Sequence, residues 1–409
     1  MMADNTKNRK GEDRVSEDPY TFCLGAGVSI SAGLPDWYTL LSKIAGRLLY
    51  LPYNKRSGDS NNDKSGQKSE KQNSYRAYTT AKNEIFEKYA YDDMFKMKLE
   101  AAYEGKYKYI FQGEDTLELA EAIYEFIFEG AVKDGCNTEV AGDSGRGKID
   151  EKEMADFYVK QFVKDICTPC VGDFYLQGSV LGAIVAILTE INPLSKKEII
   201  TYNYDDLLEK SLCQVGGIKT DEINSYGLTG EVDSKNNKGQ YHIYHVHGYL
   251  PITEEANGQE SDKIILTESS YMNIEKIGYH WIHVIQSYKY HTNILIFVGF
   301  SGQDYNFRRI LRNLSSGEAA HHYIFICIDD IVDRVFKKQK DFLDENEYSQ
   351  FINDRKKLKE EYSFELVMLN QILSAKSLYW EKHGLITIWT TISELPGMLL
   401  KLKEGIQKR

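Results

Sequence analysis

The sequence predicts an α/β protein with a doubly wound parallel sheet and a helical insertion. Short apolar strand candidates alternate with helical patterns along most of the chain. Two of these candidates, residues 293–299 and 323–328, are apolar throughout, as expected for strands that helices cover on both faces. The first candidate, residues 20–24, leads directly into a glycine-rich turn. A helical pattern at residues 37–50 follows. Strand, glycine turn and helix is the arrangement with which open parallel sheets build anion sites.

Composition excludes several classes of protein. The 409 residues carry a net charge of −11, which argues against broad binding to nucleic acids or to acidic membranes. No apolar run reaches the length of about 18 to 20 residues that a membrane span requires. Residues 1–18 are polar and do not form a signal peptide, and six cysteines are too few for a disulfide scaffold. We therefore expect a cytoplasmic protein with a flexible tail at residues 1–18.

The first glycine-rich turn contains Gly25, Ala26, Gly27 and Ser29. Small residues let backbone N–H groups approach a diphosphate closely, and the following helix adds a partial positive charge at its N-terminus. The spacing G-A-G-x-S-x-x-x-G differs from the usual dinucleotide pattern G-x-G-x-x-G. The turn thus predicts an anion site of an atypical kind.

A helical insertion is expected at residues 51–170. Within it, residues 54–74 are polar and contain no aliphatic side chain, which predicts a disordered loop. A second polar break occurs at residues 140–148. Apolar residues at helical spacing mark one face of the remainder: Leu117, Ala120, Ile123, Tyr124, Ile127 and Phe128.

Alternation of strands and helices resumes after the insertion. We expect strands at 198–202, 240–246, 293–299 and 323–328, and helices at 180–191, 206–214, 269–290 and 303–314. The nucleotide-binding domain would then comprise residues 19–50 and 171–330. An extension at 331–409 would contain a charged helix at about 343–382, a strand at 385–389 and a helix at 391–404.

A polar segment after the strand at 198–202 contains Asn203, Asp205 and Asp206. Because it follows a strand and opens a helix, its side chains should lie at the carboxyl edge of the sheet, where such folds bind ligands. One of the two aspartates could serve only as a helix N-cap. That explanation does not account for Asn203.

Three histidines, His242, His245 and His247, lie along the next strand candidate. Strand alternation places His245 and His247 on one face and His242 on the other. A zinc site would need three or four ligands, and no cysteine or carboxylate lies nearby at ligand spacing. His247 stands at the end of the strand before Gly248, and an imidazole with a pKa of about 6.5 suits a general base. We interpret His245 as a structural or supporting residue.

Taken in order, these motifs resemble those of the sirtuins, which bind NAD in a variant of the Rossmann fold. The glycine turn followed by Pro35 and Asp36 resembles their first nucleotide-binding motif. Asn203 and Asp205 fall where sirtuins carry Thr-Gln-Asn-Ile-Asp, and His247 falls where they carry the His-Gly of the catalytic base.

A fourth motif begins at Gly299 and Ser301, which fall where sirtuins carry a Gly-Thr-Ser loop that touches the nucleotide. Its longer form, which runs through Asp304 to Arg308 and Arg309, resembles bacterial sirtuin-like proteins of antiphage defence. The two arginines are more simply interpreted as a solvated helix face with ion pairs.

The chain departs from the deacylating sirtuins in one respect. These enzymes carry a four-cysteine zinc ribbon after the His-Gly, whereas the only Cys-x-x-Cys here, Cys167 to Cys170, precedes the Asn203 motif. We therefore expect no zinc or other metal, and the cleft for an acyl-lysine peptide is in doubt.

The resemblance implies an NAD hydrolase that releases ADP-ribose and nicotinamide. Its predicted role is that of an antiphage effector, which depletes NAD and causes abortive infection. Gly25, Ala26, Gly27 and Ser29 would bind the diphosphate, with Pro35, Asp36, Gly299 and Ser301 also contributing to nucleotide binding. Asp205 would orient the nicotinamide, Asn203 would hold the ribose and the attacking water, and His247 would act as the base.

Two alternatives remain open from the sequence. One is a module that senses NAD or ADP-ribose without turnover, and the other is a protein deacylase or ADP-ribosyltransferase. The resemblance also implies control through assembly, either as a homo-oligomer or with a HerA-type hexameric ATPase. No membrane and no sequence-specific nucleic acid is expected as a partner.

Overall fold

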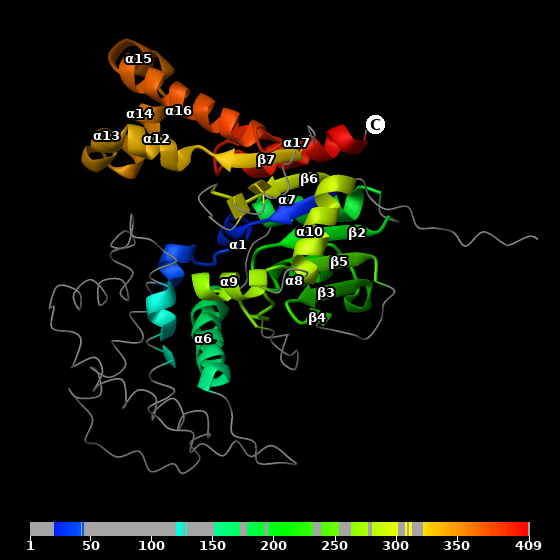
Figure 1. Ribbon diagram of the computed structural model, residues 1–409. Helices are drawn as coiled ribbons and strands as arrows, with labels where there is room; N and C mark the ends of the chain where they lie inside the picture. Colours follow the sequence, from blue (N-terminus) through cyan, green and yellow to red (C-terminus); the bar gives the residue numbers. More distant parts are fainter. Residues whose placement is uncertain are drawn as a thin grey trace, which may run out of the picture.

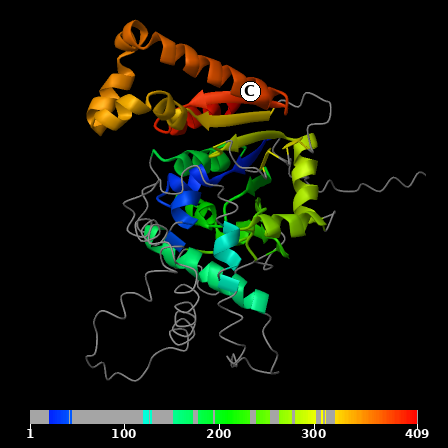
Figure 2. The same cartoon turned by 60° about the vertical axis from the view of Figure 1, so that its left-hand side comes forward.

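The computed structural model is shown in Figures 1 and 2. It describes residues 20–41, 43–44, 120–125, 127–128, 151–171, 178–192, 195–231, 239–252, 263–276, 280–301, 307–308, 311–312 and 322–407. The predicted tail at 1–18 and the predicted loop at 54–74 lie outside these residues, as does most of the predicted insertion. Among the described residues, no helix combines the length and the apolar character needed to cross a membrane.

The described strands form one eight-stranded sheet in the order β4-β3-β5-β2-β1-β6-β7-β8. Their bounds are β1 (Tyr20–Leu24), β2 (Lys197–Thr201), β3 (Ile223–Gly227), β4 (Gly230–Glu231), β5 (Tyr241–His245), β6 (Ile294–Val298), β7 (His322–Cys327) and β8 (Leu385–Thr390). Seven of these strands are parallel, and only the short edge strand β4 runs antiparallel to its neighbour. The predicted α/β fold with a parallel sheet is thereby confirmed.

Helices cover both faces of this sheet (Figure 1). Their bounds are α1 (Ala26–Ile30), α6 (Glu151–Cys167), α7 (Val180–Glu190), α8 (Leu207–Gln214), α9 (Glu268–Lys276), α10 (Trp281–Thr292), α12 (Asp329–Val335), α13 (Lys337–Phe342), α14 (Glu345–Asn353), α15 (Arg355–Glu361), α16 (Ser363–Glu381) and α17 (Leu395–Gln407). Successive strand residues alternate between two buried clusters, because side chains along a strand point to opposite faces. In β1, Phe22 and Leu24 pack into the cluster with α7, α8 and α17, whereas Cys23 packs into the cluster with α10.

The strand order reverses direction at β1. On one side of β1 lie β2, β5 and β3, and on the other side lie β6, β7 and β8. Ligands of open parallel sheets bind at such a switch point, outside the carboxyl ends of the strands. The segments that leave β1, β2, β5 and β6 at this edge begin with Gly25, Tyr202, Val246 and Gly299. The fold thus brings all four motifs singled out in the sequence to one edge.

Helices α12 to α16 form an arm that projects beyond the sheet in both views (Figures 1 and 2). The arm has a small core of its own, which contains Phe336, Phe351 and Leu358. Helix α16 then leads back toward the sheet, where Trp380 is buried in the cluster with α10. Strand β8 pairs with β7, and α17 packs over α7, so the last residues of the chain complete the sheet.

Several elements differ from the sequence-based prediction. Strands β3 and β4 were not predicted, because Ile223–Gly227 contains Asn, Ser and Gly instead of an apolar run. The helix expected at 269–290 is described as two helices, α9 and α10. The long helix expected at 343–382 is broken, since Asp344 and Asp354 each cap the start of a new helix. The predicted glycine turn contains a short helix, α1.

The described part of the predicted insertion shares the main core. Ala120, Ile123 and Ile127 are buried in the same cluster as β1 and α7, together with one face of α6. These residues therefore pack against one face of the parallel sheet and extend its hydrophobic core.

Candidate functional site

The glycine loop after β1 packs directly against the loop after β6. The Gly25 N–H donates to the Val298 carbonyl at 2.9 Å, and the Gly27 N–H donates to the Gly299 carbonyl at 2.9 Å. A Cβ added at Gly25 would lie 2.7 Å from the Gly299 carbonyl oxygen, and Gly299 has a φ of 80°. The glycines are therefore required for close approach between the two loops. Ala26 between them is exposed and begins α1.

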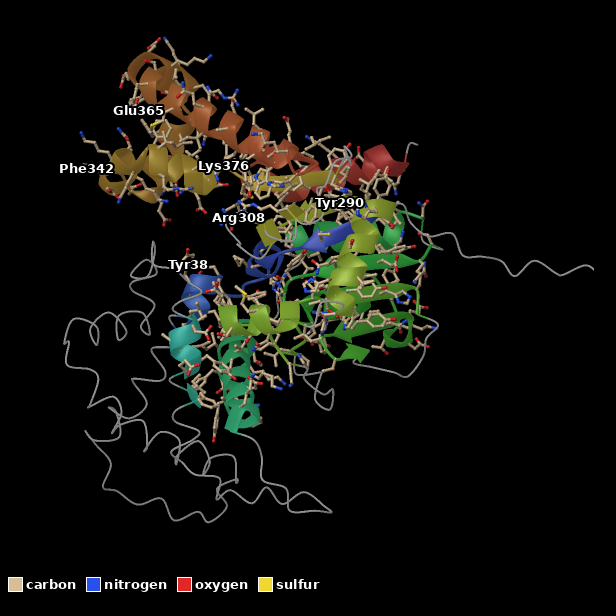
Figure 3. All side chains as sticks on the ribbon, in the orientation of Figure 1. Tyr38, Tyr290, Arg308, Phe342, Glu365 and Lys376 are labelled. Atoms are coloured by element: carbon tan, nitrogen blue, oxygen red, sulfur yellow. The ribbon has the colours of Figure 1, made fainter. Side chains whose placement is uncertain are left out.

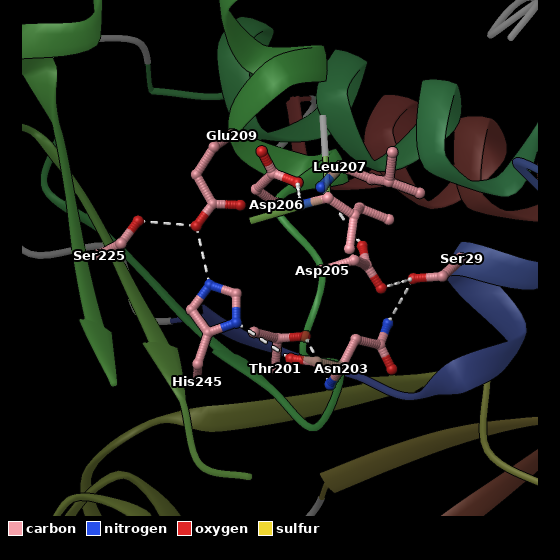
Figure 4. Close-up of polar contacts among 10 residues, drawn as sticks. Ser29, Thr201, Asn203, Asp205, Asp206, Leu207, Glu209, Ser225 and His245 are labelled. Atoms are coloured by element: carbon pink, nitrogen blue, oxygen red, sulfur yellow. Dashed lines mark hydrogen bonds and ion pairs between the residues drawn. The ribbon is translucent and has the colours of Figure 1, made fainter. Parts of the chain in front are cut away.

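Three of the predicted site residues form one hydrogen-bonded cluster at the carboxyl edge of the sheet (Figure 4). Ser29 donates from Oγ to Asp205 Oδ2 at 2.7 Å. Asn203 donates from Nδ2 to Ser29 Oγ at 2.8 Å and to the Gly25 carbonyl at 3.1 Å. The side chains that follow β2 are thus hydrogen-bonded to the glycine loop that follows β1. This agrees with the prediction that the segment after β2 lies at the carboxyl edge of the sheet.

Asp205 carries a perturbed carboxyl group. Burial raises the pKa of Asp205 to about 6, against the opposing effect of the hydrogen bonds from Ser29 and from the Leu207 N–H. The capping explanation applies to it only in part, because the 3.3 Å bond from Leu207 is long. Asp206 occupies the N-cap position of α8, but its Oδ1 accepts from the Ile252 N–H at 2.9 Å instead of from the helix. A carboxyl group that titrates near neutral pH in a site of this kind is typical of functional positions.

His247 is placed differently from our expectation. Strand β5 ends at His245, so the alternation does not extend to His247, and the two rings have different neighbours. His247 is 6% exposed and lies edge-on to the rings of Tyr202 and Tyr271, with centroid distances of 5.1 and 5.2 Å. The Tyr271 hydroxyl, from α9, lies 3.3 Å from Nε2 and 3.4 Å from Nδ1. The prediction that both histidines share a face is therefore wrong.

His245 lies beneath the loop that carries Asn203. Its Nδ1 is 3.0 Å from the Asn203 carbonyl oxygen, and its Nε2 is 2.8 Å from Glu209 Oε1 in α8. Burial alone would lower the pKa of His245, but the Glu209 carboxylate raises it above the ordinary value. Likewise, burial would raise the pKa of Glu209, but the His245 imidazolium holds it below the ordinary range.

The other predicted nucleotide contacts lie around this cluster. Asp36 accepts a hydrogen bond from the Thr39 N–H at 2.7 Å and so caps the helix that begins at residue 37, while Pro35 beside it is half-buried. Ser301 is exposed just beyond Gly299. Their roles in nucleotide binding stay predictions.

Arg308 is less exposed than the prediction of a solvated helix face implies. It is half-buried near α16, where its charge and that of Arg334 add to burial in lowering the pKa of Lys376. Figure 3 labels both Arg308 and Lys376 where the arm meets the sheet. Arg309 and Asp304 lie outside the described residues.

Metal ligands do not gather among the residues that the structure describes: no group of three or more His, Cys, Asp or Glu side chains there could hold an ion. Neither Cys167 nor Cys170 forms a disulfide, and Cys170 donates from Sγ to the Ile166 carbonyl.

Part of the chain matches a known protein family. Residues 197–360 match the SIR2-like domain family. The matched span includes Asn203, Asp205, His247, Gly299 and Ser301, but not the glycine loop after β1. No curated protein gives a significant match to the chain. The match and the parallel sheet support a sirtuin-like protein with an NAD-related activity, because SIR2-like domains are usually NAD-dependent enzymes.

Sequence reasoning missed four residues that support the site. Glu209 and Ser225 surround His245, and Tyr202 and Tyr271 surround His247. Glu209 could have been identified, because a carboxylate in the first turn of the helix after β2 faces the neighbouring strand β5. Tyr271 gave no signal, since it lies in α9, which contains no motif.

Proposed function

We propose that this protein hydrolyses NAD to ADP-ribose and nicotinamide. The observation that carries the proposal is the Ser29–Asn203–Asp205 cluster at the switch point of a SIR2-like sheet. An amide and a carboxylate held at this edge can bind the polar groups on either side of a nicotinamide–ribose bond. Their attachment to the glycine loop keeps them beside the expected diphosphate position.

In the proposed reaction the bond between ribose C1′ and the nicotinamide nitrogen breaks, and its electron pair leaves with nicotinamide. The transition state has oxocarbenium character, as in glycoside cleavage. Water adds its oxygen to C1′ and loses a proton. Asn203 holds the ribose and this water, Asp205 accepts a hydrogen bond from the carboxamide, and His247 takes the proton. The loop that contains Gly25, Ala26, Gly27 and Ser29 lies against the diphosphate, supported by Pro35, Asp36, Gly299 and Ser301. Because the N–H groups of Gly25 and Gly27 bond to the loop after β6, these two glycines contribute close approach and not hydrogen bonds.

The burial of His247 favours one second candidate function. A general base must reach the reacting water, whereas His247 is 6% exposed between two tyrosine rings. A protein that binds NAD or ADP-ribose as a sensor would need no such access. The two functions differ in nicotinamide release: a sensor binds NAD and leaves it intact. Deacylation and ADP-ribosyl transfer to a protein would instead require an acceptor in the assay.

We further propose that the enzyme is an effector of antiphage defence in the cytoplasm, where NAD depletion aborts infection. Such an activity must be suppressed at rest, and the arm offers a surface for control by assembly. Phe342 and Phe364 on the arm are 80% and 74% exposed. Neither side chain belongs to the small core of the arm. Figure 3 labels Phe342 at the outer end of the arm. Self-association through the arm, or docking of a HerA-type ATPase, would cover them.

The decisive experiment incubates the purified full chain with NAD, alone and with candidate partners, and measures nicotinamide by chromatography. We expect release that is abolished by Asn203→Ala and by His247→Ala. Wild-type turnover by either variant would contradict the assigned roles. Binding without release in every preparation would favour the sensor. Light scattering of the wild type and of a Phe342→Glu, Phe364→Glu variant tests the arm, and a monomeric wild-type chain that is fully active alone would contradict control by assembly.

A further inference from the structure

A buried ion pair supports the loop that carries Asn203 and Asp205. The His245 side chain is 1% exposed, and the Glu209 side chain is 13% exposed. Their closest atoms, His245 Nε2 and Glu209 Oε1, lie 2.8 Å apart. Ser225 in β3 donates from Oγ to the same carboxylate oxygen at 2.7 Å. Figure 4 shows this chain of contacts running from Ser225 through Glu209 and His245 to the loop.

The two neighbours of the His245 ring fix its protonation state. Nδ1 faces the carbonyl oxygen of Asn203, and Nε2 faces a carboxylate oxygen of Glu209. The Asn203 carbonyl oxygen accepts hydrogen bonds, and so does the Glu209 carboxylate in its ionised form, which the lowered pKa of Glu209 favours. With Glu209 ionised, a neutral imidazole has a single N–H and would turn a lone pair toward one of the two oxygens. The contacts therefore fit an imidazolium paired with a carboxylate.

The charges around this ring favour the same state. From α8 the ring faces Glu209, and from the loop after β2 the charge of Asp205 also favours the imidazolium. Tyr249 contributes a ring edge with its centroid 4.8 Å from that of His245, and Ser225 contributes a neutral hydroxyl. Among the residues that the structure describes around this ring, the acidic groups therefore favour the imidazolium.

We propose that the Glu209–His245 ion pair is a positioning device that fixes the Asn203 peptide and thereby the Asn203 and Asp205 side chains. The Asn203 N–H donates to Thr201 Oγ1 at 3.1 Å, and its carbonyl accepts from His245, so both ends of the residue's backbone are held. With the backbone fixed, the side chain of Asn203 reaches Ser29, which in turn contacts Asp205. The inference rests on the proposed function for its consequence in NAD binding, but the positioning itself can be measured without NAD.

Two substitutions at His245 separate the two hydrogen bonds. The amide nitrogen of Asn stands close to the position of Nδ1 and can still donate to the Asn203 carbonyl. The amide nitrogen of Gln stands close to Nε2 and can donate only to Glu209. If positioning acts through Asn203, His245→Gln should loosen the loop and His245→Asn should largely preserve it. A residue needed only to fill space would not distinguish the two variants in this order.

The primary measurement is amide hydrogen exchange of residues 201–207 by mass spectrometry on the full chain. We expect His245→Gln to accelerate exchange there by at least about tenfold, the factor expected for loss of a hydrogen bond to a charged group, with little change in the rest of the sheet. Ser225→Ala, which removes only the hydroxyl beneath Glu209, should give a smaller change of the same sign. The Ser225→Ala variant still tests the inference if His245→Gln does not fold. His242→Gln is the matched control, since His242 is buried on the same strand and contacts Tyr226 instead of the loop.

Calorimetry with NAD gives the second readout. We expect NAD affinity to fall about tenfold in His245→Gln and to be largely retained in His245→Asn. The loss of affinity should increase with the exchange rate of the loop. Unchanged exchange of residues 201–207 in both His245→Gln and Ser225→Ala would overturn the inference, as would an equal effect of His242→Gln. A ring ¹⁵N spectrum showing a neutral His245 at pH 7 would also overturn it. If the wild type neither binds nor cleaves NAD, the proposed function fails, while the exchange data still decide the positioning.

Discussion

Replacing Asp205 by Asn should stabilise the fold while weakening the candidate activity. Burial raises the pKa of Asp205 from 3.8 to about 6. The ionised carboxylate therefore costs the folded state about 3 kcal/mol at neutral pH, because one pKa unit corresponds to 1.36 kcal/mol. A neutral amide of the same shape removes that cost. A cost of this kind, retained in the natural protein, is typical of a group kept for function.

The hydrogen bonds of the cluster can survive this substitution. The amide oxygen can accept from the Leu207 N–H, and the amide nitrogen can donate to Ser29 Oγ once the Ser29 hydroxyl turns its own proton away. Some geometry will be lost, so we expect a net gain of about 1 to 3 kcal/mol in the free energy of unfolding at pH 7.5. Nicotinamide release should fall at least about tenfold, because a charged acceptor for the carboxamide is lost.

The pH dependence of the gain identifies its cause. The folded-state pKa of Asp205 lies above its unfolded value, so the cost is absent below about pH 4, where both states are protonated. It grows between about pH 4 and 6 and is constant above that range. Urea denaturation at pH 7.5 and at pH 4.5 compares the full cost with the smaller cost that remains near the lower end of this range. Asp36→Asn is the control, since an Asn caps a helix as well as an Asp does. A less stable Asp205→Asn protein at pH 7.5, or an equal gain at both pH values, would refute the reasoning.

Three further predictions follow from the same site. Gly299→Ala should lower the free energy of unfolding by about 1 to 3 kcal/mol and abolish NAD binding, because the added Cβ would lie 2.7 Å from the Val28 backbone nitrogen and Gly299 has a φ of 80°. Denaturation measures the loss of stability and calorimetry measures NAD binding. A denaturation midpoint equal to that of the wild type would contradict the prediction. NAD affinity should decrease as the pH falls through about 6, where Asp205 becomes protonated, and Asp205→Asn should remove this dependence; calorimetry between pH 5 and 8 tests it. Chelator treatment should leave nicotinamide release unchanged and elemental analysis should find no stoichiometric zinc, whereas one tightly bound zinc per chain would draw attention to Cys167 and Cys170.

The fold could be predicted from the sequence because buried parallel strands leave a strong signal. The expected strands at 293–299 and 323–328 coincide within two residues with β6 and β7, whose side chains are apolar on both faces. Strand β3 gave no such signal, since it lies near one edge of the sheet and contains Asn224 and Ser225. The breaks within the arm depend on capping by single aspartates, which periodicity over a long charged segment does not reveal.

The candidate site was predictable to the extent that each motif follows a strand. Asn203 and Asp205 had to lie at the carboxyl edge, and the structure brings them to Ser29 there. The surroundings of His247 were not predictable, because they depend on where β5 ends and on Tyr271 in α9. The purpose of the glycines also needed the structure: the N–H groups of Gly25 and Gly27 bond to the loop after β6, a contact between segments far apart in the sequence.

The cost of burying Asp205 explains why its loop is held from two sides. A carboxylate with a raised pKa gains hydration if the loop moves toward solvent, so a flexible loop would let it escape. On one side, Ser29 donates to the Asp205 side chain and accepts from Asn203, and on the other, the His245 imidazolium holds the Asn203 carbonyl. Unfavourable local states persist only where the surrounding structure fixes them. The buried Glu209–His245 pair and the raised pKa of Asp205 are thus connected features, because the His245 imidazolium both holds the Asn203 carbonyl and opposes the rise in the pKa of Asp205.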